Sequence, residues 1–469
     1  MRCWGAALAA ILFSVYGAEA QISSFKHIIV VIQENRTPDN LFQGLCIPAS
    51  MCGVTSNTTQ YDIQMNNWSD KTAASGVTQP VAVPLANAYD LDHAHSGFVA
   101  QCDLQGSVCK MDGAASLGCS GTCPPKPAYA YVDDSTGAVD PYIAMARQYG
   151  WANLMFQTNQ GASFAAHQFL FGGTSAPTAA QDAQGIFAAD NPTPFGTAVA
   201  GCVAPAGTTI ALITPAGETG STYPCFEHQT MGDLGFSWRY YSPGVTSVSN
   251  TLWNAPLAIR HICVPDHPGG VCTGEAWARH VDLNPSDVLT DIANCKLQSV
   301  SWVNPTGQNS DHANMSDGGG PSWVAAIINA VGTSTGCDQG RGYWNDTAIL
   351  VTWDDWGGWY DHESPPILPG VQGSYQYGFR VPFIFISAYT SPGYINPYPH
   401  DFGTIARFIE QNFGAQEGVL NFADARSTTD LLTFFNLSAT PRAFSLIPAA
   451  KPAAFFLNDQ RPALAPDND

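Results

Sequence analysis

Two continuous apolar runs, far apart along the chain, dominate the hydrophobic pattern. Residues 25–33 and 347–352 are rich in Ile and Val and lack the alternation of a strand with one face in water. Each run is followed by side chains that carry oxygen donors, Glu34-Asn35 after the first and Asp354-Asp355 after the second. If both are strands of one parallel sheet and lie side by side, these four side chains converge at a single edge. Capping of a following helix is the alternative use of the acids.

Strand and helix patterns alternate over much of the remaining chain. Strands are expected at residues 151–157, 237–241, 297–303 and 378–387. Helices are expected at residues 140–149, 163–172, 320–331 and 400–412. Alternation of this kind is typical of an α/β fold with a parallel sheet.

Two long stretches interrupt this alternation. Residues 43–130 and 175–295 are rich in turn-forming residues and have little periodicity. We interpret them as ordered loop insertions in one domain that covers residues 21–469. The chain of 469 residues is 45% hydrophobic, which is enough for a large core.

The first twenty residues predict a signal peptide, residues 1–20. Arg2 precedes an apolar run at 4–15, and Ala18-Glu19-Ala20 supplies small residues at the cleavage positions. The run is too short to span a membrane, so no stable membrane insertion is expected. This predicts a mature chain that begins at Gln21 and a secreted or periplasmic location.

The thirteen cysteines support export, because Cys3 falls in the signal peptide and an even twelve remain. Local spacing predicts six disulfides: Cys46–Cys52, Cys102–Cys109, Cys119–Cys123, Cys202–Cys225, Cys263–Cys272 and Cys295–Cys337. Half of a zinc site is the alternative for Cys119 and Cys123, although no second pair has matching spacing.

The net charge of −20, with only 18 Lys and Arg, limits the range of partners. An acidic surface disfavours nucleic acid and anionic membranes. An anionic substrate must then be attracted locally, by a metal ion or by helix termini.

Several isolated residues carry candidate chemistry. In Asp92-His93-Ala94-His95 an extended backbone would point both imidazoles the same way, which suits metal or phosphate contact. Ser163 follows a Gly turn at the start of a predicted helix, where the backbone amides favour a negative oxygen. It is a candidate nucleophile, with simple N-capping as the alternative. His312 lies just beyond another predicted strand.

Taken in order, these segments resemble the bacterial phosphoesterase family of acid phosphatases and phospholipases C, within the alkaline phosphatase superfamily. The resemblance rests on His27-Ile-Ile-Val-Val-Ile-Gln-Glu-Asn-Arg-Thr37, Gly161-Ala-Ser-Phe-Ala-Ala-His167 and Thr352-Trp-Asp-Asp-Trp-Gly-Gly-Trp-Tyr-Asp-His362. Shorter matches lie at residues 92–95, 110–113, 301–305, 310–312, 378–382 and 401–410.

The resemblance implies an alkaline-phosphatase-like three-layer sandwich, with a mostly parallel central sheet flanked by helices and long insertions held by disulfides. It implies one divalent metal ion, with Glu34, Asn35, Asp354 and Asp355 as ligands and Ser163 as nucleophile. His93, His95 and His312 match the family's active-site histidines, which would contact phosphate oxygens or protonate the leaving group. No other cofactor is implied.

Three positions depart from the family pattern. Ala162 replaces a Pro before the nucleophile, and Ala166 replaces an Asn ahead of His167. Pro397 stands where the family has a histidine, with His400 displaced from that position.

The chemistry also follows from the residues. Phosphate esters repel nucleophiles, so hydrolysis needs a cation and a deprotonated attacking oxygen. Oxygen ligands favour Ca²⁺, Mg²⁺ or Mn²⁺, and Zn²⁺ is also compatible.

We therefore predict a monomeric, secreted, metal-dependent phosphoesterase that hydrolyses phosphate mono- or diesters through a phosphoserine. Small phosphate esters and phospholipid headgroups are the expected substrates. A non-catalytic carbohydrate-binding protein, with Trp353, Trp356, Trp359 and Tyr360 stacking on sugars, is one alternative. A sulfatase-like hydrolase is the other, although the Cys-x-Pro-x-Arg signature is missing. Asn35-Arg36-Thr37 is a glycosylation sequon, and we predict that Asn35 is unmodified.

Overall fold

The computed structural model describes residues 25–106, 108–194, 199–214, 217–244, 251–267, 269–366, 377–416, 418–420, 423, 427 and 429–461. The predicted signal peptide, residues 1–20, lies outside the described residues.

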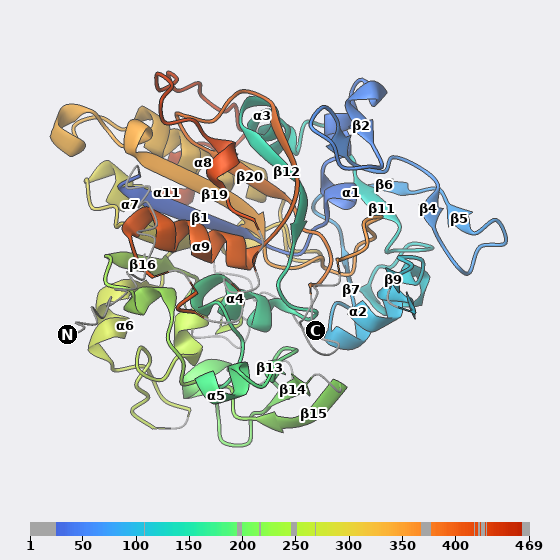
Figure 1. The fold of residues 1–469 in the computed structure, drawn as a ribbon, viewed down its shortest axis with the longest axis horizontal. Helices are drawn as coiled ribbons and strands as arrows, with labels where there is room; N and C mark the ends of the chain where they lie inside the picture. Colours follow the sequence, from blue (N-terminus) through green and yellow to red (C-terminus); the bar gives the residue numbers. More distant parts are fainter. Residues whose placement is uncertain are drawn as a thin grey trace, which may run out of the picture.

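An eight-stranded sheet forms the centre of the molecule (Figure 1). Its strands, in spatial order, are β17 (Val281–Asp282), β16 (Trp238–Tyr241), β18 (Val300–Val303), β1 (His27–Gln33), β19 (Thr347–Trp353), β20 (Phe383–Ile386), β12 (Gly150–Phe156) and β21 (Tyr394–Asp401). All neighbouring pairs are parallel except the two that involve β20, which runs antiparallel to β19 and β12. The predicted mostly parallel α/β sheet is therefore confirmed.

The strands β1 and β19 are direct neighbours and pair in parallel, as the sequence predicted. Gln33 at the end of β1 pairs with Trp353 at the end of β19, and the Asp354 amide donates to the Gln33 carbonyl oxygen at 3.0 Å. Ile28 to Ile32 are completely buried. Burying each such side chain stabilises the fold by about 1.5–3 kcal/mol, which fixes this register firmly.

Helices cover both faces of the sheet and complete three layers (Figure 1). One layer contains α3 (Asp140–Gln148), α7 (Asp287–Ala293), α8 (Gly320–Thr333) and α11 (Ala453–Leu457). The other contains α4 (Ser163–Gly172) and α9 (Phe402–Phe413), which contact each other. Shorter helices are α1 (Pro38–Leu41), α2 (His95–Cys102), α5 (Ala179–Asp182) and α6 (Glu275–His280).

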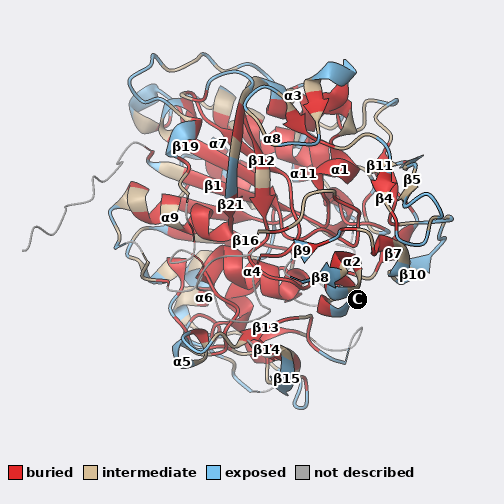
Figure 2. Cartoon of the chain, turned by 45° about the vertical axis from the view of Figure 1, so that its right-hand side comes forward, coloured by how far each residue is buried: buried red, intermediate tan, exposed pale blue. Residues whose placement is uncertain are grey.

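The central strands of the sheet and the helix α4 are deeply buried (Figure 2). Every residue of α4 is buried, and so is every residue of β19. A helix that is apolar all round is expected only where other elements cover all of its sides. For α4, the helix α9 and the 175–295 region provide this cover, together with Trp302 of the sheet, which contacts Leu170 and Phe171.

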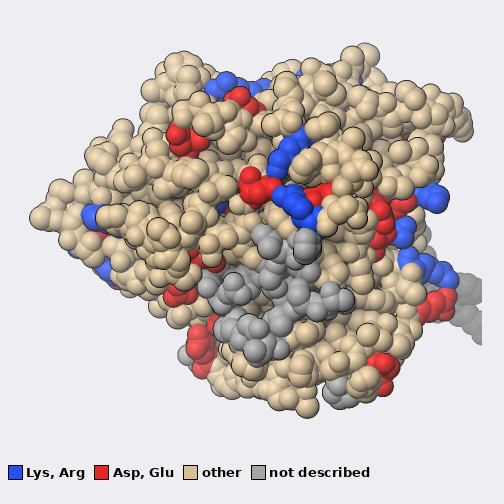
Figure 3. Space-filling model, turned by 180° about the vertical axis from the view of Figure 1, so that it is seen from behind, with Lys and Arg blue, Asp and Glu red and all other residues tan. Residues whose placement is uncertain are grey.

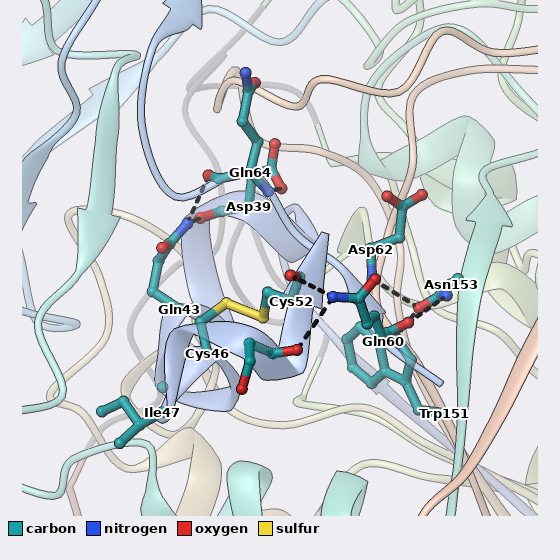
Figure 4. The surroundings of a disulfide bond; sticks show 12 residues. Asp39, Gln43, Cys46, Ile47, Cys52, Gln60, Asp62, Gln64, Trp151 and Asn153 are labelled. Atoms are coloured by element: carbon teal, nitrogen blue, oxygen red, sulfur yellow. Dashed lines mark hydrogen bonds between the residues drawn. A yellow bond between two sulfur atoms is a disulfide. The ribbon is translucent and has the colours of Figure 1, made fainter. Parts of the chain in front are cut away.

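The 43–130 region is an ordered insertion of short strands. These are β2 (Cys52–Gly53), β3 (Tyr61–Asp62), β4 (Trp68–Ser69), β5 (Val77–Thr78), β6 (Val81–Val83), β7 (Tyr89–Leu91), β8 (Leu104–Gln105), β9 (Val108–Cys109) and β10 (Cys119–Gly121), with β11 (Ala130–Val132) at its end. Figure 4 shows how it is anchored beside the Cys46–Cys52 bond: Asn153 of β12 donates to the Gln60 carbonyl oxygen at 3.0 Å and accepts from the Asp62 amide at 2.9 Å.

All six predicted disulfide pairs are present. The Cys119–Cys123 bond rules out the alternative of half a zinc site at these two cysteines.

Two expectations about the sheet need correction. The strand expected at residues 378–387, the last that the sequence predicts, is followed by another, β21 (Tyr394–Asp401), which forms the edge of the sheet. The 175–295 region is also more than a loop insertion, since it supplies β16 and β17 to the central sheet. Its remaining strands, β13 (Phe187–Ala188), β14 (Ile210–Thr214) and β15 (Gly217–Thr222), form a small separate sheet.

A buried ion-pair cluster joins the insertion to the sheet. The Arg380 guanidinium donates to both carboxylate oxygens of Asp361, at 3.0 and 3.1 Å, and to Asp62 Oδ2 at 3.3 Å. His362 lies between Asp39 Oδ2, 2.8 Å from Nδ1, and Asp62 Oδ1, 3.2 Å from Nε2. The guanidinium and the imidazole together compensate the buried acids, so this cluster needs no metal ion.

Figure 3 shows the molecule from behind, where most of the surface is uncharged and Lys and Arg lie beside acidic residues. Within the described part of the chain, no helix is long and apolar enough to cross a membrane.

Candidate functional site

Three buried side chains converge at the carboxyl edge of β1 and β19. Glu34 follows β1, Asp354 follows β19, and His167 comes from α4. One ligand atom from each lies within 4.8 Å of the others, and all three side chains are fully buried. His167 Nε2 is 3.2 Å from Glu34 Oε1 and 3.6 Å from Asp354 Oδ2. Two carboxylates this close in a buried site need a compensating positive charge.

Asn35, the residue after Glu34, has an unusual backbone conformation. Its φ of 59° is left-handed, which Asn tolerates better than most residues. The Asn35 amide nitrogen Nδ2 donates to His93 Nε2 at 2.9 Å, and the backbone N–H donates to Asp354 Oδ1 at 3.1 Å. Asn35 Oδ1 and Asp354 Oδ2 are buried without a hydrogen-bond partner among the described residues. Both atoms therefore fit as donors to a divalent cation.

The Gly357-Gly358 turn holds the Asn35 backbone against the end of β19. Both glycines have left-handed φ, 61° and 72°. A Cβ on Gly357 would lie 2.5 Å from the Asn35 carbonyl oxygen, and one on Gly358 would lie 2.5 Å from Leu91 Cβ. Only glycine satisfies both the φ and the close approach here.

Ser163 faces the second acid of the pair. It is the first residue of α4, is fully buried, and donates from Oγ to Asp355 Oδ2 at 3.3 Å. The other oxygen of Asp355 accepts from the Gly357 amide at 2.7 Å, which fixes the carboxylate. The Ser163 hydroxyl thus lies at a helix N-terminus beside a carboxylate that can accept its proton.

His167 reaches the cluster because it is one helical turn after Ser163. Residues four apart lie on the same face of a helix, so the hydroxyl and the imidazole point to the same edge. Burial lowers the pKa of His167 to about 4, and the imidazole is therefore neutral at neutral pH. Its Nδ1 lies 3.5 Å from the Tyr240 hydroxyl.

The three predicted histidines have different surroundings. His93 Nδ1 donates to the Leu91 carbonyl oxygen at 2.7 Å, which leaves Nε2 to accept from Asn35. His312 Nδ1 donates to the Ala313 carbonyl oxygen at 2.6 Å, and its ring centroid is 5.9 Å from that of His93. His95 Nδ1 donates instead to the Gln160 carbonyl oxygen at 2.9 Å, in the loop before Ser163.

The expectation that His93 and His95 point the same way from an extended segment is wrong. Because the helix α2 begins at His95, the backbone is not extended there. The His93 imidazole bonds to Asn35, whereas the His95 imidazole bonds to the Gln160 carbonyl oxygen. His95 is also tied through its backbone N–H to Asp190 Oδ1 at 2.6 Å.

The aromatic residues that follow β19 are packed inside the protein. The rings of Trp353, Trp356, Trp359 and Tyr360 are all fully buried. Because these rings are packed inside the protein, they offer no surface on which a sugar could stack, contrary to the carbohydrate-binding alternative.

Comparison with known proteins places this architecture in a family. The sequence profile of the Phosphoesterase family matches residues 25–416, which covers most of the chain. The chain therefore belongs to the phosphoesterase family, as the order of its motifs predicted.

Curated relatives are bacterial phospholipases C. A non-hemolytic phospholipase C of Pseudomonas aeruginosa is 26% identical over 47% of this chain and 34% of its own length. Phospholipase C B of Mycobacterium tuberculosis is 28% identical over 45% of this chain and 43% of its own length. The matched regions are thus less than half of each relative.

Among solved structures, the chain is similar to an alkaline phosphatase superfamily protein from Vibrio parahaemolyticus, with a TM-score of 0.32 and 10% identity, over 62% of this chain and 65% of that one.

The residues of the cluster were partly missed by the sequence reasoning. Glu34 and Asp354 converge as predicted, and the Asn35 backbone N–H bonds to Asp354, whereas His167 was not predicted in the cluster. The signal that could have identified it is the spacing of four residues from Ser163 within one predicted helix.

Proposed function

We infer that this chain is an exported, metal-dependent phosphoesterase that hydrolyses phosphate mono- or diesters through a phosphoserine on Ser163. The observation that carries the proposal is the Ser163 hydroxyl bonded to Asp355, beside a buried group of metal donors at the edge of the sheet. Membership of the phosphoesterase family and similarity to phospholipases C support phosphate esters as the substrate class.

The donor atoms fit one divalent cation. Glu34, Asn35 Oδ1 and Asp354 would hold it, and Asp355 remains a predicted ligand as well as the partner of Ser163. A bound divalent cation would neutralise phosphate oxygens and make the serine hydroxyl more acidic.

The first step forms the Ser163 Oγ–phosphorus bond and breaks the bond from phosphorus to the leaving alcohol oxygen. The hydroxyl proton passes to Asp355 Oδ2, the acceptor of its hydrogen bond. His312 is the residue that we assign to protonate the leaving oxygen, because His93 already uses both ring nitrogens in bonds to Leu91 and Asn35. The backbone amides at the start of α4 favour the negative oxygens.

The second step reverses these roles. A water oxygen attacks phosphorus and its proton passes to the now neutral His312, while Ser163 Oγ leaves and takes back the proton held by Asp355. The products are phosphate, or a phosphate monoester, and the starting enzyme.

The test compares wild type with Ser163→Ala on p-nitrophenyl phosphate, bis-p-nitrophenyl phosphate and phosphatidylcholine, each with and without a chelator. Loss of the nucleophile is expected to lower kcat by at least about a thousandfold. Chelation should abolish wild-type turnover, and added divalent ions should restore it. A Ser163→Ala protein that keeps full activity on any of these esters would show that the nucleophile is another group. p-Nitrophenyl sulfate, included as a fourth substrate, would expose a sulfatase instead.

A further inference from the structure

One of the two ring nitrogens of His167, Nε2, has an unusual environment. This atom is fully buried and makes no hydrogen bond to any described residue, although Glu34 Oε1 is only 3.2 Å away. The direction of the contact, rather than its length, therefore prevents Nε2 from donating to the carboxylate. A buried ring nitrogen aimed at two carboxylates without a hydrogen bond needs another partner between them.

The spacing of the donor atoms fits an ion between them. Two ligand atoms that are each about 2.1 Å from one ion lie about 3.0 Å apart at a right angle and about 3.4 Å apart at a tetrahedral angle. The observed separations of His167 Nε2, 3.2 Å from Glu34 Oε1 and 3.6 Å from Asp354 Oδ2, lie close to these values.

The side of the ring away from the cluster is also held in place. His167 Nδ1 faces the Tyr240 hydroxyl at 3.5 Å, and that hydroxyl donates to the Trp253 carbonyl oxygen at 2.9 Å. The Trp253 ring lies nearly parallel to the imidazole, with 6.5 Å between ring centroids. A histidine ligand is usually oriented in this way through its second nitrogen.

We propose that His167 is a metal ligand, and that the site therefore selects an imidazole-binding divalent ion such as Zn²⁺ over Ca²⁺ or Mg²⁺. This deepens the proposed function, on which it rests for the role of the ion. Carboxylate and amide oxygens alone would suit Ca²⁺ or Mg²⁺, which bind imidazole weakly. A neutral nitrogen donor added to Glu34, Asp354 and Asn35 Oδ1 gives the mixed set that Zn²⁺ prefers.

The position of His167 on α4 also bears on the geometry of the attack by Ser163. Because Ser163 and His167 lie one turn apart on a single buried helix, the nucleophile and the metal donor are held at a fixed spacing. The same helix face would thus set the distance from the attacking oxygen to the ion.

The experiment measures binding of Zn²⁺ and Ca²⁺ by equilibrium dialysis to wild type, His167→Gln and His228→Gln. His228 is the control, because it is a buried histidine near the other end of α4, beside Gly172. We expect His167→Gln to weaken Zn²⁺ binding by at least about tenfold. Mutating a residue that only hydrogen-bonds to a metal ligand already lowers metal affinity by about that factor. Its Ca²⁺ binding should be unchanged or tighter, and His228→Gln should bind both ions as wild type does. Unchanged Zn²⁺ affinity in His167→Gln would overturn the proposal.

A second measurement keeps the proposal testable if His167→Gln does not fold. Pulsed electron paramagnetic resonance of the Mn²⁺-loaded protein detects a coordinated imidazole through its nitrogen nuclei. The nitrogen signal should persist in a His93→Gln/His95→Gln/His312→Gln triple variant, which lacks the three histidines predicted for the site and keeps His167. Its absence there would contradict the assignment.

Activity of the same preparations separates this inference from the proposed function. A wild-type protein that binds Zn²⁺ through His167 but hydrolyses no phosphate ester would refute the function and leave the ligand assignment intact. An active enzyme whose Zn²⁺ affinity does not depend on His167 would do the reverse.

Discussion

At the scale of single residues, the adjacent acids Asp354 and Asp355 have different partners. Asp354 Oδ2 faces His167, and its Oδ1 accepts from the backbone of Asn35 and of Asp355. Asp355 faces Ser163. Successive side chains at the end of a strand point in opposite directions, so two neighbouring acids can serve two different groups.

This division predicts that Asp355→Asn impairs the attack while Glu34, Asn35 and Asp354 still hold the ion. The amide keeps the shape of the carboxylate but cannot take the serine proton, so the rate of phosphoserine formation should fall by about 10²–10⁴-fold. Rapid-quench measurement of the phosphoenzyme gives this rate. The bound metal, measured on the same protein, should stay at the wild-type stoichiometry. If metal content falls together with the rate, Asp355 acts mainly as a ligand.

The sequence predicted the candidate site residues that follow strands and the one at a helix N-terminus, but it did not predict His167 within that helix. Glu34, Asn35 and Asp354 could be predicted because the end of a buried parallel strand fixes where its next residues lie. His167 could not be assigned in the same way, since the face that α4 turns to the sheet depends on tertiary packing and the helix is apolar on all sides.

At the scale of elements, the turn after β19 determines how closely the two halves of the site approach. Gly357 has no side chain, and the Asn35 carbonyl oxygen lies 2.5 Å from the position that a Cβ would take. The β19 turn and the β1 end are therefore in direct backbone contact at this point.

Gly357→Ala is predicted to displace Asn35 and to inactivate the protein. The left-handed φ alone costs an alanine about 1–2 kcal/mol, and the contact at 2.5 Å adds to that cost. Gly76→Ala is the matched control, because its φ of 74° is also left-handed but a Cβ there would meet nothing within 4 Å. Thermal unfolding and kcat of both variants give the comparison. Equal destabilisation with activity retained in both would mean that the close approach to Asn35 has no role.

Strand existence was easier to predict than strand direction or the edge of the sheet. Phe383–Ile386 is a continuous apolar run, and such a run does not show the direction of the strand. Its antiparallel pairing with β19 therefore could not be predicted from the sequence. The strand β21 contains Pro397 and Pro399, which argue against a central strand. Its place at the edge of the sheet explains why both prolines are tolerated.

At the scale of the whole molecule, the ion-pair cluster around Arg380 ties distant segments together. It combines Asp39 of α1, Asp62 of β3 and Asp361, with Glu363 at its border. Within this cluster burial opposes the charging of His362, yet Asp39 and Asp62 outweigh it and raise the pKa of His362 to about 10.

The raised pKa predicts a loss of stability at alkaline pH. The folded protein holds the His362 proton up to about pH 10, whereas the unfolded chain releases it near the ordinary value of 6.5. The stabilisation is therefore complete below about pH 6.5 and is lost as the pH rises through about 10. In the upper part of this range, the free energy of unfolding should fall by up to about 1.4 kcal/mol per pH unit.

Urea unfolding between about pH 8 and 10 measures this slope in wild type and in His362→Gln. Burial raises the pKa of Asp361 to about 7 despite Arg380, so most of its titration is complete below this range. The His362→Gln protein should be less stable than wild type at pH 8 and should show a shallower slope. An exposed substitution, His267→Gln, controls for the loss of a histidine. Parallel slopes in wild type and His362→Gln would refute the assignment.

The disulfides were predicted in full because each pair is close in the sequence, with separations from 4 to 42 residues. The ion-pair cluster was not predicted, because its members come from α1, the insertion and the stretch between β19 and β20. Nothing in local spacing connects such residues.

The pairing of β1 with β19 also has a consequence for how the protein folds. Asn35 and Asp354 are 319 positions apart, so their contact closes a loop that contains most of the chain. Contacts of such long range form late and slowly, because the loop must first lose its conformational entropy. The donor group at this edge does not exist in the unfolded chain, and an ion that binds there stabilises only the native state. Metal uptake during refolding would therefore report the closing of the central sheet.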